Sequence, residues 1–157
     1  MKQKEIEFRF KMDEKYFNDN IKGKIHPIEI KQCYIQLKDK EHTRIRIETF
    51  HDGNQRATMT TKTGEKPSRI EIESEIDVEQ ALIMFKSSEY KLEKKRYILK
   101  QDGFKWEIDF FEKEKILMVE IELPSIDAPF PHPLWLRENV TFDKKYSNIA
   151  IAKRKKN

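Results

Sequence analysis

Charged residues alternate with apolar residues near the start of the chain, and their types are those that bind metals and phosphates. Residues 5–10 read EIEFRF, so Glu5, Glu7 and Arg9 fall at every second position. Paired carboxylates hold hard divalent cations through oxygen ligands, whereas Arg and Lys clusters match phosphate oxygens. A polyphosphate with its metal needs both signs. RNA binding alone would favour the cations without so many acids beside them.

The same period of two recurs in later stretches, and in a strand it brings the charges onto one face. The faces predicted in this way carry Arg44 and Arg46; Arg69, Glu71, Glu73 and Glu75; Lys94 and Arg96; Lys105, Glu107 and Asp109; and Glu120 and Glu122. The opposite faces are apolar. Two arrangements explain this pattern: a sandwich with its charges in water, or a closed sheet whose apolar exterior is covered and whose charges line the interior. Such an interior must be hydrated or filled, because unpaired buried charge is costly.

Most of the charged residues named above fall in stretches with strand periodicity, so strands are expected to position them. We predict eight, at 3–12, 28–38, 43–49, 55–63, 68–76, 92–100, 104–111 and 116–123. Turn signals at 51–54, 63–67 and 101–103 predict antiparallel hairpins between neighbouring strands. The sequence therefore predicts a mainly β (α+β) domain whose antiparallel sheet curls into a barrel.

The remaining elements are expected to be short. Helices are predicted at 13–21 and at 77–88, where Asp77 and Gln80 have the spacing of a capping box, and a final helix is predicted within 146–155. Four of the six prolines fall in 123–136, which predicts an ordered loop.

Composition bounds the class of protein. The 157 residues fit one domain spanning 1–157, and 2 Trp, 5 Tyr and 10 Phe in regular alternation argue against disorder although 38% of residues are charged. The net charge of +4 is small beside 32 basic and 28 acidic residues, so it gives little support for nucleic-acid binding. A single cysteine, Cys33, excludes an internal disulfide and fits a reducing, cytoplasmic location. The longest apolar run, at 81–85, is too short to cross a bilayer.

Several other residues are expected to be structural. His26, His42, His51 and His132 share no ligand spacing, so they are predicted to be surface or loop histidines and not a zinc site. Cys33 is predicted to be a buried or half-buried thiol. Trp106 and Trp135 are predicted to cover the apolar exterior of the barrel.

Taken in order, the charged motifs resemble the CYTH domain family, the triphosphate tunnel metalloenzymes, over nearly the whole chain. The motifs that carry the resemblance are EIEFR (5–9), QCYIQL (32–37), RIRI (44–47), TTKT (60–63), RIEIE (69–73), KKRY (94–97), WEIDFF (106–111), VEIEL (119–123) and VTFDKKYSNIAIA (140–152), with Tyr146 and Asn148. The resemblance implies a closed eight-stranded antiparallel β-barrel that forms a charged tunnel for a triphosphate and a divalent metal.

The resemblance also implies an activity. It implies a hydrolase that depends on Mg²⁺ or Mn²⁺ and acts on a small-molecule triphosphate: inorganic tripolyphosphate first, with ATP and thiamine triphosphate as other substrates. A class IV-type adenylate cyclase and a polyphosphate- or nucleotide-binding module with little turnover remain alternatives, although the second strand resembles bacterial inorganic triphosphatases more than cyclases. No membrane and no specific nucleic acid is expected as a partner, and the protein is expected to be a monomer or a homodimer.

The residues that match the family motifs receive roles by this resemblance. The implied metal ligands are Glu5, Glu7, Glu120 and Glu122. The implied catalytic residues are Glu5, Glu7, Arg9, Glu73 and Asp109. The implied substrate-binding residues are Arg9, Tyr34, Arg44, Arg46, Lys62, Arg69, Lys94 and Arg96. The family usually has Lys where this chain has Arg9, and because Arg stays charged where Lys can relay a proton, binding is expected to survive this change better than catalysis.

Overall fold

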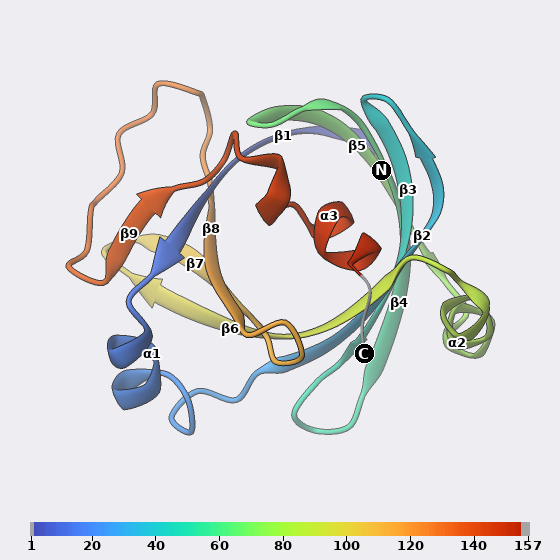
Figure 1. Cartoon of the computed structure of the whole chain (residues 1–157), viewed down its shortest axis with the longest axis horizontal. Helices are drawn as coiled ribbons and strands as arrows, with labels where there is room; N and C mark the ends of the chain where they lie inside the picture. Colours follow the sequence, from blue (N-terminus) through green and yellow to red (C-terminus); the bar gives the residue numbers. More distant parts are fainter. Residues whose placement is uncertain (1, 155–157) are drawn as a thin grey trace.

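Eight antiparallel strands close into a barrel in the computed structural model, which describes residues 2–154 (Figure 1). The strands are β1 (Lys2–Met12), β2 (Ile28–Lys38), β3 (Glu41–Thr49), β4 (Gln55–Glu65), β5 (Ser68–Ile76), β6 (Lys91–Gln101), β7 (Phe104–Phe111) and β8 (Ile116–Glu122). They pair in the order β5-β4-β3-β2-β6-β7-β8-β1. The first half of β1 then pairs back with β5, and its second half pairs with β8. The predicted closed barrel is confirmed.

The remaining elements are short: α1 (Glu14–Asn20), α2 (Val78–Ser87), β9 (Leu136–Asn139), the 3₁₀ turn η1 (Lys144–Tyr146) and α3 (Asn148–Lys153). The Asp77 side chain accepts a hydrogen bond from the backbone N–H of Gln80, as the capping spacing predicts. Residue 155 of the predicted final helix lies outside the described residues. No helix in the described part of the chain has the length and apolar character needed to span a membrane.

The strand β9 was not predicted, because it follows the proline-rich segment directly. It pairs with the end of β1 at Phe10 and Met12, where the register shifts. The four residues LREN have no apolar alternation of their own. Their strand conformation therefore depends on the edge that β1 offers where its pairing with β8 ends.

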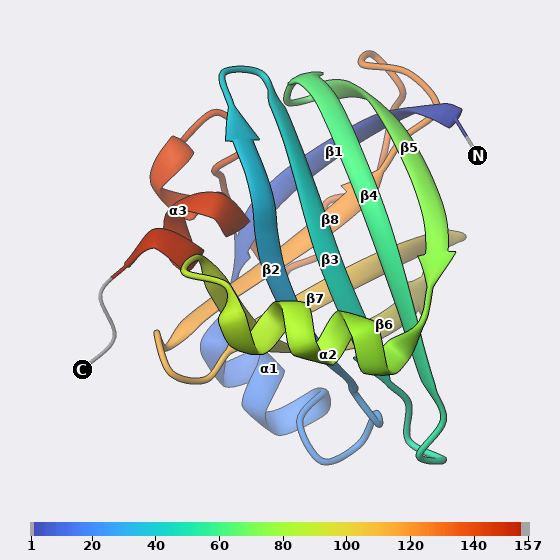
Figure 2. The same ribbon diagram turned by 90° about the vertical axis from the view of Figure 1, so that its right-hand side faces the viewer.

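The outward faces of the strands form two apolar cores. Over β1, β6, β7 and β8, α1 and the proline-rich loop enclose a cluster that includes Trp106 and Trp135, whose rings meet edge to face at 5.1 Å. Over β2, β3 and β4, α2 buries a cluster that contains Cys33 (Figure 2). The predictions for both tryptophans and for the thiol are confirmed.

The charged faces point inward, so the alternative of a sandwich with its charges in water is wrong. Arg9 and Glu120 are each only 4% exposed, and Lys94 is 3% exposed. Side chains this deeply buried on the face opposite the two apolar cores lie in the barrel interior.

One end of the barrel is closed by α3 (Figure 1). Inward-facing apolar residues from four strands pack there against Ile151 and Ala152 of the helix: Tyr34, Leu92, Phe111 and Met118. This apolar end cap limits the charged part of the interior to the remaining length of the barrel.

Candidate functional site

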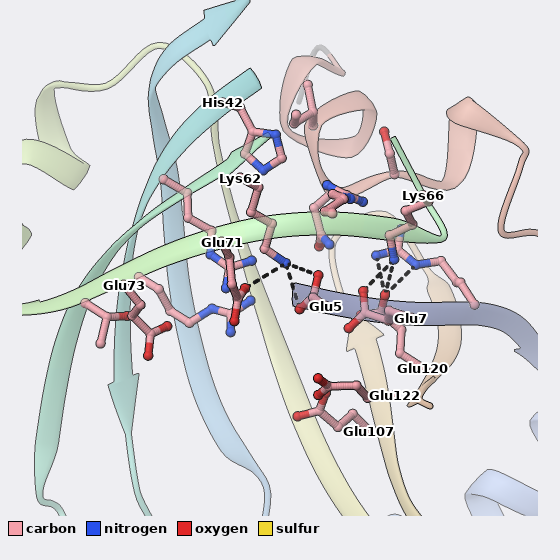
Figure 3. Close-up of a pocket in the computed structure, with 18 of the residues that line it drawn as sticks. Glu5, Glu7, His42, Lys62, Lys66, Glu71, Glu73, Glu107, Glu120 and Glu122 are labelled. Carbon is pink, nitrogen blue, oxygen red and sulfur yellow. Dashed lines mark hydrogen bonds and ion pairs between the residues drawn. The ribbon is translucent and has the colours of Figure 1, made fainter. Parts of the chain in front are cut away.

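The barrel interior holds a cavity of about 320 Å³ whose walls are almost entirely charged (Figure 3). Every strand except β9 contributes side chains to it. The lining includes Glu5, Glu7, Arg9, Tyr34, His42, Arg44, Arg46, Lys62, Lys66, Arg69, Glu71, Glu73, Arg96, Glu107, Glu120 and Glu122. The cavity reaches solvent near Arg56 and Lys105, which are 45% and 59% exposed.

Carboxylates from β1, β5 and β8 form one side of the cavity. The Lys62 ammonium lies 2.9 Å from Glu5 Oε1 and 3.7 Å from Glu71 Oε2. The Lys66 ammonium lies 2.6 Å from both Glu7 Oε1 and Glu120 Oε2. Two lysines therefore pair with four carboxylates: Glu5, Glu7, Glu71 and Glu120.

Two further carboxylates, Glu107 and Glu122, lie close together below these pairs (Figure 3). Burial and the negative charges of Glu5 and Glu7 raise the pKa of Glu122 above its ordinary value. Burial and neighbouring negative charge both disfavour the ionised carboxylate, and a bound cation would offset both effects.

The donor set of this acidic side fits a divalent metal. Its ligand atoms are carboxylate oxygens, which hard cations such as Mg²⁺ and Mn²⁺ prefer. Within residues 2–154, however, no three Asp, Glu, His or Cys side chains converge on one point that could hold a metal. The carboxylates are instead paired with the ammonium groups of Lys62 and Lys66, so metal binding would require those ion pairs to rearrange.

Cations from β3 and β5 line the same cavity, and Arg69 is the cross-strand neighbour of Glu5. Arg46 Nε donates to Gln32 Oε1 at 2.8 Å, and burial together with the charges of Arg44 and Arg96 lowers the Arg46 pKa to about 10. The buried Nε atoms of Arg44 and Arg69 have no hydrogen-bond partner among the described residues. Like charges held together with unsatisfied donors favour an anion between them.

A third group of charges lies toward the α3 end. Lys94 Nζ donates to Asp109 Oδ2 at 2.7 Å and to the side-chain oxygen of Asn148 at 3.1 Å. Arg96 reaches both oxygens of Asp109, at 2.8 and 2.9 Å. Burial, only partly offset by Asp109, lowers the Lys94 pKa to about 7. Although burial alone would raise it, the charges of Arg96 and Lys94 lower the Asp109 pKa.

The structure brings the predicted site residues into one interior, but Lys94 and Asp109 do not line the cavity. Asp109 is 2% exposed and lies behind Lys94 and Arg96, so it orients those cations. Glu73 is half-buried near the solvent end, where it accepts from Thr60 and faces Arg56 at 3.8 Å. Tyr34 accepts from Gln32 at 2.7 Å and belongs to the apolar end cap.

Three residues of this site had no predicted role: Lys66, His42 and Glu107. Lys66 belongs to the turn predicted at 63–67, and strand alternation assigns no face to a turn residue. Glu107 shares the predicted face of Asp109 but has no implied role in the family motifs. Its carboxylate accepts from Arg96 at 3.1 Å.

The prediction that His42 is a surface or loop histidine is wrong. His42 is buried in the cavity wall, where its ring meets the Tyr34 ring edge to face at 5.6 Å. Burial and the charges of Arg69 and Lys62 lower its pKa to about 3, so the ring is neutral at pH 7. Its position two residues before Arg44 was the available signal, because it places both side chains on the same face. His26, His51 and His132 are exposed, as predicted.

A closed antiparallel barrel whose interior holds both carboxylates and cations is the arrangement that the charged motifs predict for a triphosphate-binding tunnel. Comparison with known families gives the same class. The CYTH domain model matches residues 3–149. The chain belongs to the CYTH family.

Relatives that share 32–35% of their residues with this chain are named inorganic triphosphatases. The chain is 35% identical to an inorganic triphosphatase of Acetivibrio thermocellus over 154 residues, covering 96% of this chain and 94% of the relative. It is also 35% identical to an inorganic triphosphatase of Nitrosomonas europaea, covering 83% and 87%. A crystal structure of an inorganic triphosphatase superposes with a TM-score of 0.66 at 32% identity, covering 98% and 97%. A Bacillus halodurans protein proposed to be an adenylate cyclase shares only the fold, with 15% identity, a TM-score of 0.59 and coverage of 79% and 82%.

Proposed function

We propose that this protein hydrolyses inorganic tripolyphosphate with the help of a divalent metal, Mg²⁺ or Mn²⁺. The observation that carries the proposal is that one cavity holds both clustered carboxylates and cations with unsatisfied donors. Burial and the charges of Glu5 and Glu7 raise the pKa of Glu122, and the buried Nε atoms of Arg44 and Arg69 have no hydrogen-bond partner among the described residues. A linear polyphosphate with its metal satisfies both groups at once. The names of the relatives support the same activity.

Each group of side chains has a distinct role in this proposal. Glu5, Glu7, Glu120 and Glu122 would hold the metal. A bound divalent cation stabilises negative charge on the phosphoryl group and lowers the pKa of coordinated water. The cations that would hold the phosphate chain are Arg44, Arg46, Lys62, Arg69, Lys94 and Arg96. Asp109 is a positioning residue in this scheme, because it forms ion pairs with Lys94 and Arg96. Like Asp109, Lys94 does not line the cavity, so it would act on the phosphates through its charge from behind the cavity wall.

The assay that tests the proposal offers tripolyphosphate, ATP and thiamine triphosphate to the purified protein with Mg²⁺ or Mn²⁺. We expect phosphate release from tripolyphosphate. Cyclic AMP with pyrophosphate from ATP would instead support a cyclase, and tight binding without product would support a binding module. Either result would overturn the hydrolase proposal.

Glu122→Gln is the sharpest variant for the metal assignment. In the part of the chain that the structure describes, Glu122 forms no salt bridge, so the change removes a ligand and leaves no cation unpaired. We expect metal-dependent hydrolysis to fall by at least about tenfold while thermal stability is kept or improved. The matched control is Glu138→Gln, on the exposed strand β9, which should leave the rate unchanged. Unchanged turnover in Glu122→Gln would contradict the assignment.

A further inference from the structure

Lys66 lies between two carboxylates that the proposed function assigns to the metal. Its ammonium is 2.6 Å from Glu7 Oε1 on β1 and 2.6 Å from Glu120 Oε2 on β8. The side chains are well buried, with exposed fractions of 12% for Lys66, 11% for Glu7 and 4% for Glu120. One ammonium therefore bridges two strands inside the barrel (Figure 3).

The hairpin between β4 and β5 aims this side chain inward. Gly64 has a φ of +110°, and a Cβ at this position would lie 3.2 Å from the Ser68 carbonyl oxygen, so the turn requires glycine. The Pro67 carbonyl accepts a hydrogen bond from the Glu7 backbone N–H at 2.9 Å. This hydrogen bond holds the hairpin beside Glu7, so the Lys66 ammonium lies close to the Glu7 carboxylate.

Lys66 compensates the charge of Glu7 and adds to the cations that already surround Glu120. Among the described residues, it is the only side chain that forms a salt bridge with Glu7. Glu120 is also paired with Arg9, at 2.9 Å. A cation bound between Glu7 and Glu120 would need the same oxygens at about 2.0–2.6 Å, so an ammonium and a metal cannot occupy this position together.

The Lys66 side chain has a second position available to it, away from the carboxylates. Lys66 also lines a second cavity beside α3, together with His42 and Arg69. Arg69 there has an unsatisfied Nε. A lysine stem has four flexible carbons and a compact charge, so the ammonium can leave the carboxylates and join Arg69 against an anion.

We propose that Lys66 competes with the metal for Glu7 and Glu120 in the free protein and, when displaced, binds the substrate phosphates. The inference rests on the proposed function, since it uses the same metal and substrate. It adds a residue that strand alternation and the family motifs leave without a role. Metal and triphosphate then favour each other's binding, because the metal releases the cation that the phosphates use.

The first test measures Mn²⁺ binding to metal-free protein by electron paramagnetic resonance, without any triphosphate. Lys66→Met removes the charge and keeps the length of the side chain. If the ammonium occupies the position nine-tenths of the time, Mn²⁺ affinity rises by about tenfold in this variant. Lys66→Arg keeps a cation there, so its affinity should stay near that of the native protein. In hydrolysis assays we expect Lys66→Met to raise the KM for tripolyphosphate.

The matched control is Lys105→Met, which removes one positive charge from the same cavity. Lys105 is 59% exposed and lies 4.0 Å from Glu107, away from Glu7 and Glu120. An equal gain in Mn²⁺ affinity in both Met variants would overturn the inference, because it would reflect net charge alone. Mn²⁺ affinity that stays unchanged or falls in Lys66→Met would overturn it as well. If the native protein hydrolyses tripolyphosphate, such a failure leaves the proposed function standing.

A second measurement needs no variant. The Lys66 side-chain nitrogen of ¹⁵N-lysine-labelled native protein is followed by NMR while Mg²⁺ is added. We expect its resonance to move in step with metal binding, and to move again when tripolyphosphate follows. A resonance that stays in place through saturation with Mg²⁺ would contradict displacement. No Mg²⁺ binding at all would overturn both the inference and the metal-dependent function.

Discussion

Arg9 joins two parts of the molecule through one guanidinium. Its Nε and one terminal nitrogen donate to Glu120 Oε2 at 3.2 and 2.9 Å. The other terminal nitrogen donates to the backbone carbonyl of Tyr146, which leads into α3. Arg9 thus links β8 to the end cap through a fork of donors, which the single ammonium of a lysine cannot reproduce.

The change Arg9→Lys is expected to lower the free energy of unfolding by about 1.5–3 kcal/mol, the usual contribution of a hydrogen bond to a charged group. Denaturation in guanidinium chloride measures it. Arg137→Lys is the control, because Arg137 is 48% exposed and its partners, Asp13 at 3.6 Å and the backbone carbonyls of Leu134 and Leu136, lie at the surface. We expect no rise in the rate of tripolyphosphate hydrolysis. A large rise in Arg9→Lys would show that the native arginine limits turnover.

Lys94 predicts a pH dependence of substrate binding. Burial, with the charges of Arg96 and Arg46, lowers its pKa to about 7. Below that pH its ammonium is charged and attracts phosphate, and above it the amine is neutral. The KM for tripolyphosphate should therefore increase as the pH rises through about 7. The Lys94→Arg variant stays charged and should show a flatter profile, and identical profiles in the two proteins would contradict the role given to Lys94.

The same shift affects stability with a defined sign. Between a folded pKa of about 7 and the ordinary lysine value of 10.5, the unfolded chain binds more protons at this position than the folded chain. The free energy of unfolding contributed by Lys94 therefore rises with pH across this window and is smallest below it. Urea denaturation at several pH values measures the slope, and Lys94→Met should flatten it.

Among the elements, α3 has the clearest structural task. It is only six residues long, yet Ile151 is fully buried in the apolar end cap and Asn148 accepts a hydrogen bond from Lys94. So short a helix has little stability by itself and depends on this packing. The end cap in turn keeps the Lys94–Asp109 group away from water.

Ile151→Ala should lower the free energy of unfolding by about 2–4 kcal/mol, because it removes buried methyl groups and leaves a cavity. Denaturation in guanidinium chloride measures this loss. The control is Ile83→Ala on α2, whose side chain is 68% exposed and whose loss should cost no more than about 0.5 kcal/mol. Equal small effects in the two variants would mean that α3 does not close the barrel.

For the molecule as a whole, the charged interior is the feature that costs stability. Many buried charges are paired there, but Glu122 forms no salt bridge among the described residues and the Nε atoms of Arg44 and Arg69 have no partner, so these groups are left to a ligand. Tripolyphosphate at about one hundred times its Kd, with Mg²⁺, should stabilise the fold by about 2.7 kcal/mol. For a chain of this size that raises the Tm by roughly 5–10 °C.

Scanning calorimetry measures this shift in Tm. The control is orthophosphate with Mg²⁺, added at the same concentration as the tripolyphosphate. A single phosphate is too short to contact the metal and all of the cavity cations at once, so orthophosphate should raise the Tm less than tripolyphosphate does. The Glu122→Gln variant should also show a reduced shift with tripolyphosphate. An equal rise in Tm with orthophosphate would contradict the match between the cavity and a triphosphate.

Local alternation was sufficient to predict most of the strands. EIEFRF is followed by seven further stretches with the same period, and a period of two is a property of the chain itself. The Asp77 cap and the three hairpin turns are equally local. For the same reason the residue types on the charged faces, and hence the metal and phosphate chemistry, were visible in the sequence.

Only the tertiary structure decided which face is inside, because alternation is the same for a sandwich and for a barrel. The pairing of β1 with β5 closes the sheet, and that contact joins residues far apart in the chain. The same closure turns His42 into a cavity residue, lets a short α3 seal one end, and brings Lys66 from a turn onto Glu7 and Glu120. Each depends on packing between distant segments, which no local pattern encodes.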